Sequence, residues 1–156
     1  MADANGAITI YEGYLNHYKM YENLSKKMDP HVRKRMLIGR SMTEESHLKR
    51  LQKRQNDQIN FAMAMESFDA LLTPTLTETA PKLDDINEDI SPGHFTRPFN
   101  YIDMCALALP MTPSRSGLPT SLRIVVPAGR EKFALKLGAA VEAVLNIVIQ
   151  PNLDRF

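Results

Sequence analysis

The sequence has a single cysteine, no long hydrophobic run and almost no net charge, and each shortage excludes a class of protein. One cysteine among 156 residues cannot form a disulfide within the chain, so a disulfide-stabilised scaffold is excluded. Seven glycines and ten prolines are ordinary numbers, so the chain is neither collagen-like nor of low complexity. A hydrophobic content of 44% is too high for a disordered tail. The composition indicates one soluble globular domain of intracellular type.

Membrane insertion and secretion are not expected. The longest mostly apolar run, over 137–149, is too short to span a bilayer and contains Glu142. The first residues, MADANG, lack the basic region followed by an apolar stretch that defines a signal peptide. With one cysteine, the expected location is the cytoplasm.

Charge is balanced over the chain but unevenly distributed along it. The formal net charge is +1, so no overall field attracts nucleic acid or a membrane. Residues 26–54 hold ten basic and three acidic side chains, and residues 55–103 hold two basic and nine acidic ones. A solvated basic helix followed by an acidic loop is favoured over a charged binding patch, because exposed helix faces are usually charged.

Apolar residues at helical spacing predict two long helices in the first half of the chain. One covers 8–28 and ends at Asp29-Pro30, because a proline forces the residue before it out of the helical region. A short helix over 31–39 follows. Ser41 and Glu44 have the spacing of a capping box, which predicts a helix from there to about residue 67. On this helix the stripe Leu48, Leu51, Ile59, Ala62 and Met63 is expected to face the core, and Lys49, Arg50, Lys53 and Arg54 mostly face water.

The second half of the chain predicts short strands and one more long helix. The expected strands cover 69–74, 107–112 and 120–126, the last two joined by a turn at 117–119. A loop over 76–98, a short helix over 100–107 and a last helix over 131–149 complete the order. The fold class is therefore α/β. Because short apolar strands need cover on both faces and three helices precede them all, we expect more chain to complete the sheet.

The histidines, the cysteine and the serines of the chain do not have the spacing of a catalytic or metal-binding motif. The four histidines, His17, His31, His47 and His94, have no metal-site spacing, and no nucleotide-binding glycine motif is present. Cys105 lies in an apolar run and is interpreted as a small buried hydrophobic residue rather than a nucleophile. Ser114 and Ser116 lie in a polar turn without the G-x-S-x-G pattern of a nucleophile elbow. No catalytic residue, metal or cofactor is assigned.

Five segments in a fixed order are similar to a known family. They are VRKRMLIG (32–39), FDALLTPT (68–75), FTRPFN (95–100) followed by ALALP (106–110), GLP (117–119) followed by LRI (122–124), and the last helix with Glu142. Together they resemble the C-terminal third of the amidase signature family, whose members hydrolyse amides with a Ser-cisSer-Lys catalytic set. The resemblance covers about residues 8–150 and implies that the chain is the C-terminal part of an amidase-signature fold, with mixed β-sheet strands flanked by α-helices.

The resemblance also implies which parts of such an enzyme are not found in this sequence. The family's nucleophile lies in a Gly-Gly-Ser-Ser-Gly-Gly stretch with the lysine further upstream, and nothing here matches either. A chain beginning at Met1 is then expected to be a truncated gene, an isolated fragment or the small chain of a split enzyme. Residues 1–156 would form a single domain or fragment, with a helical segment over 8–67, strands and loops over 68–127 and the C-terminal helix over 131–149.

Three substrate-binding positions follow from the resemblance. Arg35 aligns with an arginine that binds the substrate carboxylate in relatives that hydrolyse glutamine for tRNA amidation, where a guanidinium can make two hydrogen bonds; an exposed arginine in a basic cluster is the alternative. Asn100 lies in the matched motif, and Asp103 and Cys105 replace the family's usual glycine and proline. The acid that binds the substrate amino group falls at Gly93, which argues against a role in a tRNA amidotransferase.

The sequence leaves two main functions open. The first is the C-terminal portion of an amidase-signature hydrolase that acts on a carboxylic amide through an acyl-enzyme, inactive without its missing N-terminal portion. The alternative is a noncatalytic fragment or oligomeric interaction module, since an incomplete sheet favours self-association. RNA binding by the basic segment 26–54 is a third possibility, disfavoured by the low net charge and the lack of a nucleic-acid motif. The expected partners are therefore an amidase portion or a second copy, with a small amide as substrate and neither nucleic acid nor membrane.

Overall fold

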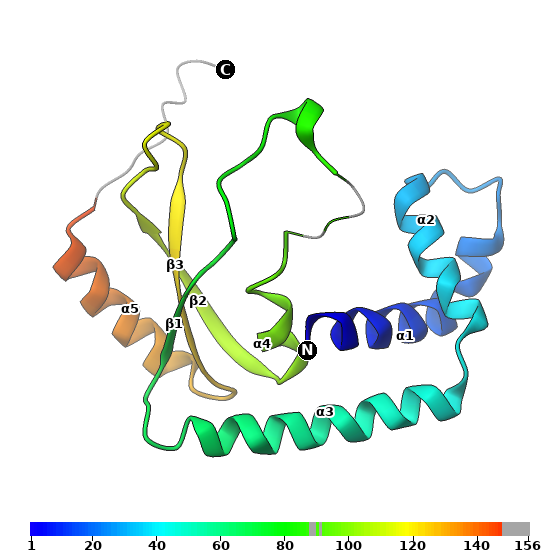
Figure 1. Ribbon diagram of the computed structural model, residues 1–156, viewed down its shortest axis with the longest axis horizontal. Helices are drawn as coiled ribbons and strands as arrows, with labels where there is room; N and C mark the ends of the chain where they lie inside the picture. The colour runs from blue at the N-terminus through cyan, green and yellow to red at the C-terminus, as the bar shows by residue number, and fades with distance from the viewer. Residues whose placement is uncertain (88–89, 91, 148–156) are drawn as a thin grey trace.

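The computed structural model describes residues 1–87, 90 and 92–147 and shows an α/β chain, as the sequence predicts. Its elements are α1 (Ala2–Glu22), α2 (Pro30–Leu37), the 3-10 helix η1 (Ile38–Ser41), α3 (Glu44–Ala64), β1 (Leu71–Pro74), the 3-10 helix η2 (Leu83–Asp85), α4 (Arg97–Tyr101), β2 (Met104–Met111), β3 (Thr120–Pro127) and α5 (Glu131–Leu145). In Figure 1, α3 runs along the bottom and joins α1 and α2 to the end that holds the sheet and α5.

The sheet places β3 between the other two strands. Its order is β1-β3-β2, and within the described residues both pairings are antiparallel. Ile124 of β3 lies opposite Leu72 of β1 and Leu107 of β2, which fixes the register of all three strands. The expected strands over 69–74 and 120–126 are confirmed to within two residues at either end.

The core lies on both faces of β3, because successive residues of a strand point to opposite sides. Ile124 and Val126 face α5, where they join Leu109 and Ala134. On the other face, the fully buried Val125 packs in a cluster with four residues of α1, α4 and the turn after α4, namely Ile8, Phe99, Tyr101 and Ile102. The central strand therefore has the two-sided cover that its apolar sequence demands.

The first helix ends earlier than predicted. It covers residues 2–22, with non-helical backbone at His17, instead of 8–28. The pair Asp29-Pro30 begins α2: the Asp29 carboxylate accepts a hydrogen bond of 2.9 Å from the Val32 N–H, and Pro30 occupies the first helical position, which needs no N–H donor. Asp29-Pro30 does mark a helix boundary, but it is the start of α2 and not the end of α1.

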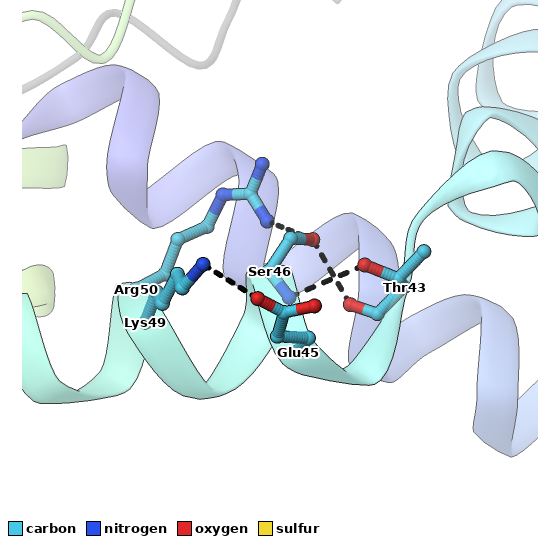
Figure 2. A network of polar contacts seen from close by, with 5 residues as sticks. All are labelled: Thr43, Glu45, Ser46, Lys49 and Arg50. Atoms are coloured by element: carbon cyan, nitrogen blue, oxygen red, sulfur yellow. Dashed lines mark hydrogen bonds and ion pairs between the residues drawn. The ribbon is translucent and has the colours of Figure 1, made fainter.

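The predicted capping box at Ser41 is wrong. Ser41 lies in η1, and its hydroxyl donates to the Ile38 carbonyl over 3.0 Å. The residue that caps α3 is Thr43, whose side-chain oxygen accepts from the Ser46 N–H over 3.2 Å (Figure 2). The 3-10 turn carries the chain past Ser41 before the extended backbone that an N-cap requires, and threonine is also a good capping residue.

The apolar stripe predicted for α3 is also largely wrong. Leu48, Ile59 and Met63 are 57, 54 and 62% exposed. The face turned toward the rest of the chain carries Leu51 and Phe61 together with the polar residues Arg54 and Asp57. Arg54, expected to face water, is turned inward, because the carboxyl end of α4 offers a backbone carbonyl that needs a donor.

The predicted helix over 100–107 is wrong as well. Helix α4 ends at residue 101, and residues 104–107 already pair with β3 in β2, with Cys105 opposite Val126. Asp103 makes this possible: its φ of +61° turns the chain sharply between helix and strand. The last helix ends at residue 145, where Asn146 adopts a left-handed conformation, and residues 148–149 of the predicted helix lie outside the described residues. Among the described helices, none is both long and apolar enough to cross a bilayer.

Candidate functional site

A cavity of about 620 Å³ lies between α2 and described residues of the stretch before α4, and Arg35 is one of its lining residues. Its lining includes the α2 residues His31, Val32, Lys34 and Arg35, and from the opposite segment Ile86, Asn87, Ile90, Pro92 and Arg97. We call this cavity the basic pocket. Asp29 also lines it, but one of its carboxylate oxygens is engaged in capping α2. The described lining residues thus carry three cationic side chains, Lys34, Arg35 and Arg97, and one carboxylate.

Close helix packing holds the wall that carries Arg35. A Cβ atom at Gly39 would lie 2.5 Å from the Tyr14 Cβ and 2.7 Å from the Ile10 carbonyl oxygen, and one at Gly13 would lie 2.2 Å from the Met36 Cε. Gly39 thus lets η1 approach α1 more closely than any other residue would allow, whereas at Gly13 the neighbour is the end of a flexible side chain that can move aside. The position of Arg35 depends on this approach.

The opposite wall carries Arg97, which the sequence reasoning did not single out. Arg97 is the first residue of α4 and is partly buried, and its backbone N–H donates to the Gly93 carbonyl over 2.9 Å. Below it, Phe99 and Tyr101 fix α4 in the core. Gly93, where the resemblance places an acid, contributes no side chain. The signal that could have identified Arg97 was its place in the FTRPFN segment, next to Asn100.

The other two predicted site residues lie elsewhere. Asn100 is exposed on α4 and is not among the residues that line the basic pocket. Asp103 is exposed and lines a different cavity of about 400 Å³ together with Phe61 and Met65. The described structure therefore brings Arg35 and Arg97 to one cavity and leaves Asn100 and Asp103 outside it.

A polar network fixes α4 to α3. The Tyr101 hydroxyl donates to the Asp57 carboxylate over 3.0 Å, Lys53 donates to the same oxygen over 2.6 Å, and the Arg54 guanidinium donates to the Tyr101 carbonyl. The hydrogen bond from Lys53, helped by that from Tyr101, lowers the pKa of Asp57. Burial, followed by the hydrogen bond to Asp57, raises the pKa of Tyr101. These groups support the base of the pocket wall rather than reach into the pocket.

Arg123 attaches the segment before α4 to the sheet. Its side chain is buried, lies 5.2 Å from the centre of the Phe99 ring, and donates to the Phe95 carbonyl over 2.8 Å. Burial lowers the pKa of Arg123. Since a buried cation needs partners, this arginine is committed to holding residues 95–99 in place.

The other nucleophile candidates have structural surroundings. Burial, together with the charge of Glu131, raises the pKa of the Cys105 thiol, which disfavours the reactive thiolate. The Ser114 and Ser116 hydroxyls lie 2.9 Å apart, and Ser114 accepts from the Leu118 N–H, in the turn between β2 and β3. Within the part of the chain that the structure describes, no three His, Cys, Asp or Glu side chains are grouped to hold a metal ion.

Comparison with known proteins gives consistent matches. A family model described as "Amidase" matches residues 2–135. One of the subunits of the glutamyl-tRNA(Gln) amidotransferase of Maricaulis maris is 32% identical over 97 residues, which are 60% of this chain and 20% of that protein. A crystal structure of an amidase has a TM-score of 0.80 and 28% identity, covering 92% of this chain and 35% of that one. An allophanate hydrolase of Kluyveromyces lactis shares the fold, with a TM-score of 0.81 and 18% identity over 92% of this chain and 25% of that one. The chain thus spans about a fifth to a third of these three proteins.

Proposed function

The chain belongs to the amidase family, and from this premise we propose that it is the C-terminal portion of an amide hydrolase. The observation that carries the proposal is the amidase fold, matched at a TM-score of 0.80 with 28% identity over 92% of the chain. In such an enzyme an activated serine attacks the amide carbonyl, the amine or ammonia leaves, and water hydrolyses the acyl-enzyme. The serine and its lysine would lie on an amidase segment outside this sequence.

The exposed surface of the chain supports assembly with more protein. Its accessible surface is 11,540 Å², whereas a compact monomer of 17.6 kDa has about 7,900 Å². Full exposure of the twelve residues outside the described ranges would account for about 2,000 Å² of this surplus. The remainder, about 1,600 Å², exceeds the roughly 800 Å² that each partner contributes to a standard protein–protein interface.

In the assembled enzyme this chain would form one wall of the substrate pocket. Arg35 would bind a carboxylate of the substrate, because it lines a cavity with other basic groups and is exposed to it. Gly93 offers no acid for a substrate amino group, so the proposed substrate is a small amide other than glutamine. Asn100 and Asp103, which lie outside the basic pocket, remain proposed substrate contacts. The proposed location is the cytoplasm, in keeping with a single cysteine.

A noncatalytic interaction module is the second candidate, and the outer face of α3 favours it. Leu48, Ile59 and Met63 are each more than half exposed there, with Gln52 between them, and burial of these apolar side chains against a partner would stabilise a complex. In this case the chain would pair with itself or with another protein and take no part in hydrolysis.

Fluorophosphonate labelling followed by intact-mass measurement separates the two candidates. The purified chain alone should form no adduct, because the activated serine lies outside it. The chain should then be mixed with an amidase N-terminal portion that contains the Gly-Gly-Ser-Ser-Gly-Gly stretch and lacks its own C-terminal third. If the chain is a portion of the hydrolase, the added protein should be labelled and the amide hydrolysed only in the mixture.

Two results would contradict the proposed function. A stoichiometric adduct on Ser114 or Ser116 would place an activated serine in this chain. A discrete oligomer with a cooperative melt that neither binds nor activates the added amidase portion would favour the interaction module.

A further inference from the structure

The two arginine side chains of the basic pocket have no acceptor within the described protein. Arg33, next to the pocket wall, is the contrast, because its side chain donates to the backbone carbonyls of Tyr21, Asn23 and Lys26. Among the described residues, neither the Arg35 nor the Arg97 side chain forms a hydrogen bond or an ion pair. Arg97 is partly buried as a residue, but its guanidinium nitrogens are not among the buried polar atoms that lack a partner, so its five donors remain open to a ligand in the cavity.

We propose that the basic pocket binds a small dicarboxylate and that Arg97 is its second anion-binding residue. Arg35 and Arg97 lie on two walls of the cavity, so each guanidinium can take one carboxylate through two parallel hydrogen bonds. Lys34 adds a third positive charge on the α2 wall. The partial burial of Arg97 strengthens its attraction to an anion compared with a fully exposed arginine.

The described lining residues offer more cations than carboxylates, which favours a ligand without an ammonium group. The only carboxylate among its described lining residues is that of Asp29, which caps α2 through the Val32 N–H. Gly93 supplies no acid beside Arg97. The inference rests on the proposed function in one respect: in the assembled hydrolase, the substrate would be an amide with two carboxylates and no ammonium group.

Titration of the chain with glutarate tests the inference without catalysis. Binding is followed by calorimetry and by amide chemical shifts, which should move for residues of α2 and 92–97. Glutaramide is the neutral analogue and glutamine the zwitterionic one. Glutarate should bind at least about tenfold more tightly than either, because each charged hydrogen-bond pair contributes more than 1.4 kcal/mol, the equivalent of that factor.

Substitutions of Arg97 and of a control arginine test whether Arg97 binds the glutarate. Arg97→Gln should weaken glutarate binding at least about tenfold, and Arg97→Lys should weaken it less, because lysine keeps the charge but loses the planar pair of donors. Arg115→Gln, in the turn between β2 and β3 and outside the pocket lining, removes the same charge and should leave the affinity unchanged. Melting curves of all variants establish that each is folded.

Three results would overturn the inference: no saturable glutarate binding at millimolar concentrations, equal affinity of wild type and Arg97→Gln, or glutamine binding as tightly as glutarate. None of these depends on labelling or hydrolysis. Glutarate binding with no complementation would refute the proposed function alone, and complementation without glutarate binding would refute the anion site alone.

Discussion

The hydroxyl of Tyr101 lies 3.0 Å from the carboxylate of Asp57, although the two residues are 44 positions apart in the sequence. Tyr101 is fully buried, and Asp57 also accepts from Lys53 one helical turn away. The contact ties the long helix α3 to α4, the element that carries Arg97. The basic pocket therefore depends on a hydrogen bond that none of its lining residues makes.

Removal of this hydroxyl should destabilise the chain. Tyr101→Phe should lower the free energy of unfolding by about 1–2 kcal/mol, because a buried hydrogen bond to a charged group is lost. Tyr14→Phe is the matched control: Tyr14 donates to Glu22 over 2.6 Å, but that bond is exposed and should contribute less than about 0.5 kcal/mol. Urea unfolding measures both, and equal effects would show that burial of the tyrosine is irrelevant.

Asp57 should make the free energy of unfolding depend on pH in the acidic range. Its pKa is lowered in the folded chain by hydrogen bonds from Lys53 and Tyr101. A carboxyl group with a lowered pKa stabilises the fold above its unfolded value of about 3.9, and this contribution disappears as the pH falls through the folded value. Wild type should therefore be more stable than Asp57→Asn near neutral pH, and the gap should close below about pH 4.

The exposed pair Glu45–Lys49 is the control for this pH dependence. It has the same spacing and the same 2.6 Å distance, but both side chains are at least 75% exposed, so Glu45→Gln should cost no more than about 0.5 kcal/mol. Urea unfolding between pH 3 and 7 is the measurement. A gap between wild type and Asp57→Asn that does not change with pH would contradict the assignment.

The approach of η1 to α1 should tolerate no side chain. Gly39→Ala should destabilise the chain by about 1–3 kcal/mol, because the new Cβ would meet the Ile10 carbonyl and the Tyr14 Cβ. Gly6→Ala, in α1 with no atom within 4 Å of its Cβ, should instead stabilise it by about 0.5–1 kcal/mol. Thermal melts compare the two, and a Gly39→Ala protein as stable as wild type would show that this contact is not close.

Replacing Asp103 by glycine should stabilise the chain, because it removes the strain of a positive φ. Its φ of +61° belongs to the left-handed region, which costs about 1 kcal/mol for a residue with a Cβ. Asp103→Gly, which restores the residue usual in the family, should raise the free energy of unfolding by about 0.5–1 kcal/mol. The exposed Asp69, which lacks a positive φ, is the control: Asp69→Gly should give no gain, since glycine only adds freedom to the unfolded chain. A loss of stability in Asp103→Gly would mean that the aspartate side chain has a role of its own.

The sequence predicted best where the signal was local. The strands around Leu72 and Ile124 follow from apolar runs that end at prolines, and the expected cover on both faces is found for β3, whereas Leu72 of β1 is 54% exposed. The failures came where two local signals competed. Ser41 and Thr43 are both capping residues, and only the path of η1 decides between them. Residues 104–107 read as either helix or strand, and the sharp turn at Asp103 decides for the strand.

The sequence alone determined the family and the α/β class, because five segments in a fixed order, helical spacing and short apolar runs are properties of the chain read from end to end. It also drew attention to Arg35. Tertiary structure decided which face of α3 is buried, since Arg54 and Asp57 turn inward to the Tyr101 carbonyl and the Tyr101 hydroxyl of α4, whatever the count of apolar residues. It also decided that Arg97 shares a cavity with Arg35 while Asn100 and Asp103 do not, because the distance between residues far apart in sequence is fixed only by how the elements pack.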